Sequence, residues 1–361
     1  MSNPSETRQT QTQRFGLLWP DLNDGLSYND VVRSSDSEST LIEFYSSKYK
    51  NSAPLQGWLQ RIENGQIRVD GTVVTDPKTI LRVGSELVYH RLPWREPDAP
   101  CLLEVLYEDG DMIALNKPSG LQVLPGGLFQ QRTVLTQLQW QASKKQEPHP
   151  VPVHRLGRGT SGILLCAKTK LAKTRLAAYF ANGTSYIEGN RKTNMEMCGT
   201  RKITKIYRAL VLIKQPIGMV QYPGVAKGLY VASSSGKPAL SKVDVLERNM
   251  QGNNTLVEIQ SGRPHQIRIH LAFIGHPLLG DPLYVGGGQP MCFDPEFVDG
   301  SFAQDGGYQR PTNPVPGDCG YFLHAHQLML SHPTTNEVIK ITAPLPSILQ
   351  TQDEAKEISI N

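Results

Sequence analysis

The sequence is poor in the features that mark several specialised classes of protein. It holds only five cysteines in 361 residues, an odd number without a CxxC pair. This usage predicts neither a disulfide framework nor a thiolate zinc site, and it fits a reducing compartment best. Residues 1–14 are polar, and no segment approaches the ~20 apolar residues of a membrane span. We therefore expect an intracellular protein of the cytoplasm or nucleus, with an organelle still open, and no membrane partner.

A strong charge of either sign is also missing. The 37 Lys and Arg residues nearly balance the 33 Asp and Glu residues, which leaves a formal charge of +4. A mildly basic balance suits an enzyme that binds a polyanion, but it is common among proteins that never touch nucleic acid. What the chain does have is length and apolar content: 39% hydrophobic residues can supply the cores of two or three domains.

The N-terminal part divides into a polar segment and a compact unit. Residues 1–40 are predicted to be disordered or poorly ordered, because the serine-rich and acidic run 33–40 buries too little to fold alone. Residues 41–95 combine two helical patterns, at 41–45 and 55–63, with a hairpin around Asp70-Gly71 and a strand at 81–89. This arrangement resembles the alpha-L RNA-binding module. Candidate phosphate contacts are Arg61, Arg68 and Arg82, for which an ordinary solvated surface is an equally good interpretation.

A stretch with three prolines, residues 93–100, separates this unit from the main domain at 101–346. The domain reads as short strands with few helices, which favours an α+β fold over a doubly wound parallel sheet. Two inserts, 182–201 and 286–320, are polar or rich in Gly and Pro and are predicted to be surface loops. A last strand pair at 322–330 and 337–342 closes the domain, and residues 347–361 form a tail that we expect to be disordered.

Five segments of the main domain carry polar or glycine-rich motifs in a fixed order. The first, Leu115-Asn116-Lys117-Pro118-Ser119-Gly120, ends a strand in a turn. The second, His154-Arg155-Leu156-Gly157-Arg158-Gly159-Thr160-Ser161-Gly162, places polar groups at the entrance of an apolar strand, which is a typical position for a functional site. The third, 205–211, is a strand with Tyr207, and the fourth, 236–245 with 255–259, is a strand pair. The fifth, 261–284, predicts a helix from Pro264 at its first position to a cap at Gly275.

Taken in order, these segments resemble RluA-like RNA pseudouridine synthases. The resemblance implies an isomerase with a mixed, mainly antiparallel sheet, no cofactor and no metal. It implies that Arg155 fills the gap left when the target uridine leaves the RNA stack, an extrusion needed because the reacting atoms are otherwise buried in the helix. It also implies that Tyr207 stacks on the uracil and that Arg268 pairs with the catalytic aspartate. That aspartate is replaced here by Gly157.

Three further residues of these motifs are candidate RNA contacts: Lys117, His154 and Arg263. For Lys117, an ordinary exposed lysine after a strand is an equally good interpretation. Tyr207, taken alone, is usually expected to be a core residue, but within the ordered set of motifs we favour its functional interpretation.

Two other site interpretations fail on physical grounds. Residues 162–169 come within one residue of a phosphate-binding loop, but the run Ile-Leu-Leu-Cys is a buried strand, and Ala167 replaces the second glycine. His265 and His270 are expected on one helix but well off a common face, and His324 with His326 could share a strand face but lack an accompanying thiolate or carboxylate cluster. Satisfied structural histidines are therefore expected rather than metal ligands.

Gly157 leaves two functional hypotheses, since removal of a nucleophile commonly costs on the order of 10⁴ to 10⁶ in turnover. The first is a working synthase in which another carboxylate, Asp281 or Asp111, takes over the role. The second is an RNA-binding or RNA-folding protein that has lost the chemistry, with Arg268 facing an unfilled anion position. Both predict RNA as the partner, tRNA or rRNA, bound by a monomer, and the inserts are the expected determinants of target choice.

Overall fold

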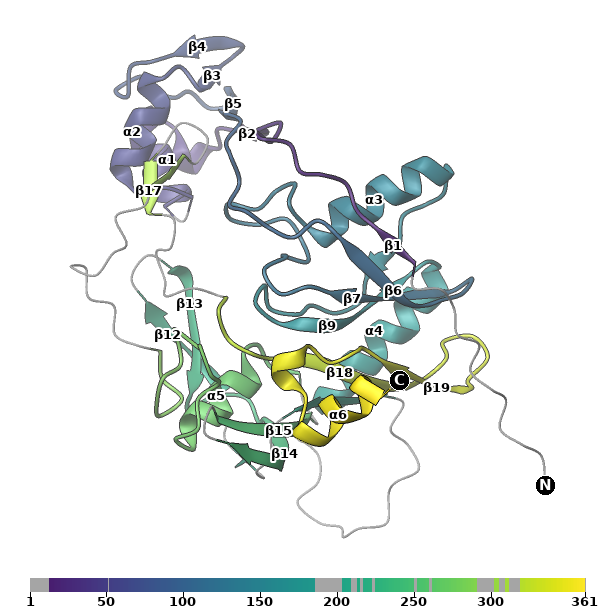
Figure 1. Ribbon diagram of the computed structural model, residues 1–361. Coiled ribbons are helices and arrows are strands. Elements are labelled where there is room, and N and C mark those ends of the chain that lie inside the picture. The colour runs from purple at the N-terminus through teal and green to yellow at the C-terminus, as the bar shows by residue number, and fades with distance from the viewer. Residues whose placement is uncertain are drawn as a thin grey trace.

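A computed structural model gives the fold of the chain and describes residues 13–50, 52–185, 203–208, 213–214, 217–222, 225–249, 252–259, 262–290, 302–304, 309–311 and 319–360. Figure 1 shows a small N-terminal unit, drawn in purple and blue, beside a larger unit built on one long sheet. Several side chains on the strands between residues 203 and 259, Tyr207 among them, lie outside the description.

The central sheet is mixed and mainly antiparallel, as the resemblance implies. Within the described residues its strand order is β1-β6-β7-β9-β18-β10-β15-β14-β11, with β19 paired to β18 and β8 to β9. Among the described strands of this sheet, only β9 and β18 pair in parallel. The strands are β1 (Arg14–Phe15), β6 (Leu103–Glu108), β7 (Met112–Lys117), β8 (Val151–Pro152), β9 (Ser161–Ala167), β10 (Ile203–Arg208), β11 (Ile213–Lys214), β14 (Leu240–Asn249), β15 (Gly252–Ile259), β18 (His324–Ser331) and β19 (Val338–Thr342).

Apolar cores lie on both faces of this sheet, which explains why β7 and β9 are apolar almost throughout. Side chains of a strand alternate between faces, so a strand that is covered on both sides loses the alternating pattern. Leu115 and Leu164 face helices α3 (Val134–Lys145) and α5 (Gln266–Phe273), whereas Ala114 and Leu165 face α4 (Lys170–Ser185). The rejection of a phosphate-binding loop at 162–169 is confirmed, because this segment is the buried strand β9 and its exit.

Smaller elements complete the larger unit. Strands β12 (Ile217–Tyr222) and β13 (Val225–Ala232) form a hairpin, and so do β16 (Phe302–Gln304) and β17 (Gln309–Pro311). The predicted helix of the fifth motif is α5. It begins at Gln266, two residues after Pro264, and ends before Gly275, whose φ of +81° suits a glycine cap. The insert 182–201 contributes the last turn of α4, and most of both inserts lies outside the described residues.

The N-terminal unit has the predicted helices and hairpin. Helices α1 (Leu41–Lys48) and α2 (Leu55–Glu63) pack on a sheet of order β2-β5-β3-β4. Its strands are β2 (Leu26–Val31), β3 (Ile67–Val69), β4 (Thr72–Val74) and β5 (Glu86–Arg91). Asp70 and Gly71 both have positive φ, +49° and +81°, as a two-residue hairpin turn requires.

Within the described residues, both terminal regions contain helices or strands that the sequence does not predict. From residue 13 onward the predicted polar segment is built into the fold: β1 pairs with β6, β2 pairs with β5, and Ser34–Asp36 is a 3₁₀ helix. The predicted tail holds α6 (Gln352–Ile360), whose start is capped by reciprocal hydrogen bonds between Thr351 and Glu354. Composition does not reveal this order, because strand pairing, two capping hydrogen bonds and a few buried apolar side chains such as Phe15 and Val32 supply it.

A buried carboxylate holds the two units together. Glu96, 2% exposed, accepts hydrogen bonds from the backbone N–H groups of residues 130, 131 and 132 at 2.8–2.9 Å and from Asn23 Nδ2 at 2.9 Å. The neighbouring Trp94 is buried against Leu128 and donates its indole N–H to the Leu128 carbonyl at 3.0 Å. The proline-rich boundary is therefore a packed junction.

Candidate active site

The second and fifth motifs meet at one cavity of about 100 Å³. The loop before β9 and the segment before β18 reach the same edge of the sheet because these two strands run in parallel, with Ser161 opposite His324. Gly162 allows this approach: a Cβ there would lie 2.3 Å from the Ala325 carbonyl oxygen. The residues that line the cavity include Arg155, Gly157, Thr160, Arg263, Arg268 and Tyr321.

Arg268 is already paired with a carboxylate, so the expected unfilled anion position beside it is occupied. Its Nε and Nη2 donate to the two oxygens of Asp281 at 2.7 and 2.8 Å, and the two residues are 2% and 6% exposed. Asp281 Oδ1 also accepts the backbone N–H groups of Leu283 and Tyr284 at 2.9 and 3.1 Å. A buried bidentate pair with these extra donors fixes the Arg268 guanidinium in one orientation.

Neither candidate carboxylate takes the place of the missing aspartate. Asp281 is buried behind Arg268 and does not line the cavity, and both of its oxygens are engaged. Asp111 lies at the start of β7, where Met112 is opposite Ala167, whereas the other end of β7 reaches the loop, with Lys117 opposite Gly162. Five residues of strand separate the two ends by about 17 Å. Among the described residues that line the cavity, none is aspartate or glutamate.

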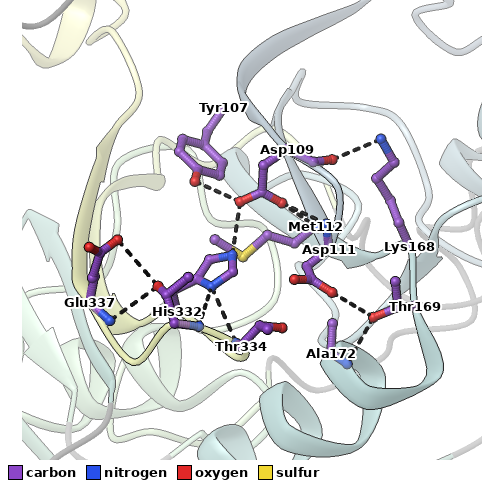
Figure 2. Close-up of polar contacts among 11 residues, drawn as sticks. Tyr107, Asp109, Asp111, Met112, Lys168, Thr169, Ala172, His332, Thr334 and Glu337 are labelled. Atoms are coloured by element: carbon purple, nitrogen blue, oxygen red, sulfur yellow. Dashed lines mark hydrogen bonds and ion pairs between the residues drawn. The ribbon is translucent and has the colours of Figure 1, made fainter.

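Asp111 belongs instead to a polar network that ties turns together at the far end of the sheet (Figure 2). It accepts a hydrogen bond from Thr169 Oγ1 at 2.9 Å. Nearby, Asp109 accepts from Tyr107 at 2.7 Å and from His332 Nε2 at 2.9 Å. Burial raises the pKa of the Asp109 carboxyl, but these bonds and those from two backbone amides outweigh it and hold the pKa below its ordinary value. The network therefore connects the β6–β7 turn to the β18–β19 turn by hydrogen bonds.

Two main-domain residues predicted to contact RNA, Lys117 and His154, form hydrogen bonds to the 154–162 loop or to the strand after it. Lys117 is fully buried, and its ammonium donates to the carbonyls of Pro118, Leu121 and Arg158 at 2.7–3.1 Å. His154 accepts the Leu165 N–H on Nε2 at 2.9 Å, its ring stacks on Phe180, and burial lowers its pKa to about 3. The prediction that Lys117 contacts RNA is wrong for this structure, since its ammonium is fully buried against the loop. The side chain of His154 is only partly buried, and its contact with RNA stays a prediction.

A third predicted contact, Arg61, is part of the core of the N-terminal unit. It is fully buried, with its guanidinium over the rings of Trp58 and Tyr89 at 4.7 and 5.2 Å. The phosphate-contact interpretation is wrong for Arg61, because a phosphate group cannot reach it. Arg68 and Arg82 are exposed, as such a contact requires.

Other predicted site residues stand at or near the cavity. Arg155 is exposed at its rim, and Arg263 is half-buried there, with Nε donating to the Pro238 carbonyl at 3.1 Å. The backbone of Tyr207 lies in β10 opposite Val257 on one side and Ala325 on the other, and β18 separates it from β9, the strand that follows the loop. Its side chain lies outside the described residues.

Each histidine of the two pairs has a hydrogen-bond partner on Nδ1, whereas Nε2 of His324 is buried with no such partner among the described residues. At α5, Nδ1 of His265 is hydrogen-bonded to Tyr284 Oη and Nδ1 of His270 to Ser241 Oγ, at 2.9 and 3.0 Å. On β18, Nδ1 of His324 is hydrogen-bonded to Ser161 Oγ and Nδ1 of His326 to the Ala343 carbonyl, both at 2.9 Å. Within the described part of the chain, no three His, Cys, Asp or Glu side chains gather as a metal site. None of the helices described has the length and apolar character needed to cross a bilayer.

Sequence reasoning missed two cavity residues, Thr160 and Tyr321. Their hydroxyl oxygens lie 3.2 Å apart, and Arg268 stacks on the Tyr321 ring at 4.2 Å. Tyr321 lies outside the five motifs, and only the pairing of β9 with β18 brings it to the loop. No local signal marks it.

Comparison with known proteins shows which family the chain is related to. The sequence profile of the family described as RNA pseudouridylate synthase matches residues 111–273. The chain is 68% identical to "RNA pseudouridine synthase 5" of Arabidopsis thaliana over 95% of this chain and 98% of that protein. It is 64% identical to the protein of the same name from Oryza sativa subsp. japonica, over 95% and 92% of the two chains. It is 30% identical to "Ribosomal large subunit pseudouridine synthase D" of Vibrio parahaemolyticus, over 83% and 85%.

The α+β fold with its loop-and-helix cavity therefore has a defined class. The chain belongs to the RNA pseudouridine synthase family, an isomerase family. Within it, the five motif segments and the similarity to the bacterial protein place the chain among the RluA-like members.

Proposed function

We propose that the protein converts a uridine in RNA to pseudouridine. In this isomerisation the bond between N1 and C1′ breaks, the uracil turns, C5 joins C1′, and the C5 proton is lost while N1 gains one. The observation that carries the proposal is the meeting of the 154–162 loop with the first turn of α5 at one cavity. Arg155 at the rim is proposed to occupy the space of the extruded uridine, which needs an exposed, mobile cation.

The remaining roles in the site follow the same geometry. Tyr207 is proposed to stack under the uracil, because its backbone position on β10 is flanked by Val257 and Ala325 beside the loop. Arg268 is proposed to present a fixed positive charge at the cavity wall, with Asp281 as the residue that positions it. Arg263 is a proposed contact to RNA phosphate at the same cavity.

The RNA target is proposed to be a tRNA or rRNA bound by a monomer inside the cell. The N-terminal unit is proposed to add phosphate contacts through Arg68 and Arg82, which are exposed. Because Glu96 and Trp94 pack the unit against the main domain, these arginines lie at a set position relative to the cavity. Such an arrangement favours an RNA with a defined fold over a flexible single strand.

A second candidate function is RNA binding without chemistry. It is supported by Gly157 together with the lack of any carboxylate among the described residues of the cavity wall. The two functions share RNA affinity, so binding alone does not separate them.

A turnover assay separates them. Cellular RNA labelled with tritium at C5 of uridine is incubated with the native chain, with Gly157→Asp and with the surface control Lys173→Met, and released tritium is counted. We expect release by the native chain and by Lys173→Met at equal rates. If the Gly157→Asp variant releases tritium and the native chain does not, the result supports an RNA-binding protein without catalytic activity, because it shows that the site lacks only the carboxylate. Mapping of the pseudouridines formed then identifies the RNA and the uridine.

A further inference from the structure

The cavity wall has hydroxyl groups where a carboxylate is expected. Gly157, at the position of the catalytic aspartate in RluA-like synthases, offers no side chain. Among the described cavity residues the hydroxyls are those of Thr160 and Tyr321. Tyrosine is a known alternative to a carboxylate as the nucleophile at the anomeric carbon of a sugar, as some glycosidases show.

Tyr321 is held against the turn that begins at Gly157. The Thr160 N–H donates to the Gly157 carbonyl at 3.1 Å and closes this turn. Thr160 Oγ1 lies 3.2 Å from Tyr321 Oη, and the two residues are 5% and 4% exposed. The phenol oxygen is thus one hydrogen bond away from the loop that supplies the nucleophile in the family.

The ring of Tyr321 is fixed from its other side. The Arg268 guanidinium carbon lies 4.2 Å from the centre of the Tyr321 ring and 5.0 Å from that of Tyr284. Asp281 in turn fixes Arg268 by two hydrogen bonds. The backbone beside the tyrosine packs closely on the segment before Asp281: the Phe322 N–H donates to the Leu279 carbonyl at 3.1 Å, and a Cβ on Gly280 would lie 2.2 Å from the Gly320 carbonyl oxygen. A side chain fixed in this way is pre-organised for one geometry, which catalysis requires.

We propose that the Tyr321 phenolate is the nucleophile of this synthase, in place of the aspartate that Gly157 replaces; the proposal rests on the proposed synthase function. The phenol proton passes to water at the cavity mouth. The phenolate oxygen then bonds to C1′ of the ribose as the N1–C1′ bond breaks, and the electron pair leaves with the uracil anion. After the ring turns, C5 attacks C1′ and the phenolate departs. Loss of the C5 proton and gain of a proton at N1 complete the isomerisation, so no oxidant, reductant or cofactor is consumed.

The phenol gives the reaction a characteristic pH dependence. Phenols ordinarily lose their proton near pH ~10 and carboxyls near pH ~4. Activity of the native chain is therefore expected to rise roughly tenfold per pH unit between about pH 7 and about pH 9. Activity of Gly157→Asp is expected to change much less over the same range, because its nucleophile is already ionised.

The test uses the full chain and four variants in the tritium-release assay. Tyr321→Phe keeps the ring under Arg268 and removes only the oxygen, and is expected to lower activity by on the order of 10⁴. Thr160→Val removes the same hydrogen bond but keeps the phenol, so it is expected to lose far less activity with a similar change in melting temperature. The double variant Gly157→Asp with Tyr321→Phe is expected to be as active as Gly157→Asp alone, which also shows that Tyr321→Phe folds.

Each outcome bears on the proposal. If Tyr321→Phe keeps the activity of the native chain, Tyr321 is not the nucleophile, although the proposed synthase function still holds. Equal losses in Tyr321→Phe and Thr160→Val overturn it too, because they show that only the hydrogen bond matters. A pH profile of the native chain that matches that of Gly157→Asp contradicts a phenolate. An inactive native chain refutes the proposed function itself, and the nucleophile with it.

Discussion

The Asp281→Asn substitution is predicted to be severely destabilising although it preserves the size and shape of the side chain. An asparagine oxygen can still accept the N–H groups of Leu283 and Tyr284, which Asp281 accepts at 2.9 and 3.1 Å. What the change removes is the negative charge that faces Arg268 at 2.7 and 2.8 Å, at a place where Arg268 is 2% exposed. Removing one partner of a buried ion pair costs about 3–5 kcal/mol. We expect a loss of that size in the free energy of unfolding.

The magnitude is checked by urea unfolding of the full chain followed by circular dichroism. Asp281→Ala is expected to lose about 1–3 kcal/mol more than Asp281→Asn, because the two backbone amides then lose their acceptor. The double variant Asp281→Asn with Arg268→Met removes both charges and is expected to be more stable than Asp281→Asn alone. A loss below about 1 kcal/mol for Asp281→Asn, the size found for exposed pairs, would refute the argument that this pair is buried and fixes Arg268.

Two further predictions concern the supports of the site. Lys117→Met is expected to lower the melting temperature and to abolish activity, because the three carbonyls that accept hydrogen bonds from the ammonium at 2.7–3.1 Å lose their donor. The matched control is Lys173→Met, on an exposed face of α4. Equal melting temperatures of the two variants would contradict the prediction. Asp109→Asn is expected to destabilise the protein at neutral pH but not in acid. The pKa of the Asp109 carboxyl is lower in the folded chain than in the unfolded chain, where it is about 4. The contribution of the ionised carboxyl to the free energy of unfolding is therefore fully present above pH ~4 and is lost as the pH falls through the folded-state pKa. Urea unfolding of the native and Asp109→Asn chains at neutral and at acid pH measures the difference in their free energies of unfolding. A difference that stays constant into acid would contradict the stabilising role of the ionised Asp109 carboxyl.

The sequence predicts the framework of this protein well and the burial of its charges poorly. The alternation lost in β7 and β9, the Asp70-Gly71 turn and the glycine after α5 are local signals, and each leads to the observed element. Lys117, Arg61 and Glu96 carry charges that ordinarily stay in water, so nothing in the sequence around them announces that they are buried. Their partners are backbone carbonyls, aromatic rings and backbone amides that only the folded chain brings into reach.

The candidate site shows the same division. Arg155, Gly157 and Arg268 could be predicted because ordered motifs carry them, and they do line one cavity. The pairing of Arg268 with Asp281 and the approach of Tyr321 to Thr160 depend on contacts between segments 13 and 161 residues apart in sequence. The second of these depends on one parallel strand pair, which no local pattern specifies.

The most direct test of the central claim is the formation of pseudouridine by the unaltered chain. Uridine-containing RNA is incubated with purified native protein, digested to nucleosides and separated by liquid chromatography with mass detection. The account predicts pseudouridine in molar excess over enzyme, formed faster at about pH 9 than at about pH 7. Pseudouridine formed only by Gly157→Asp, with none from the native chain at either pH, would contradict it.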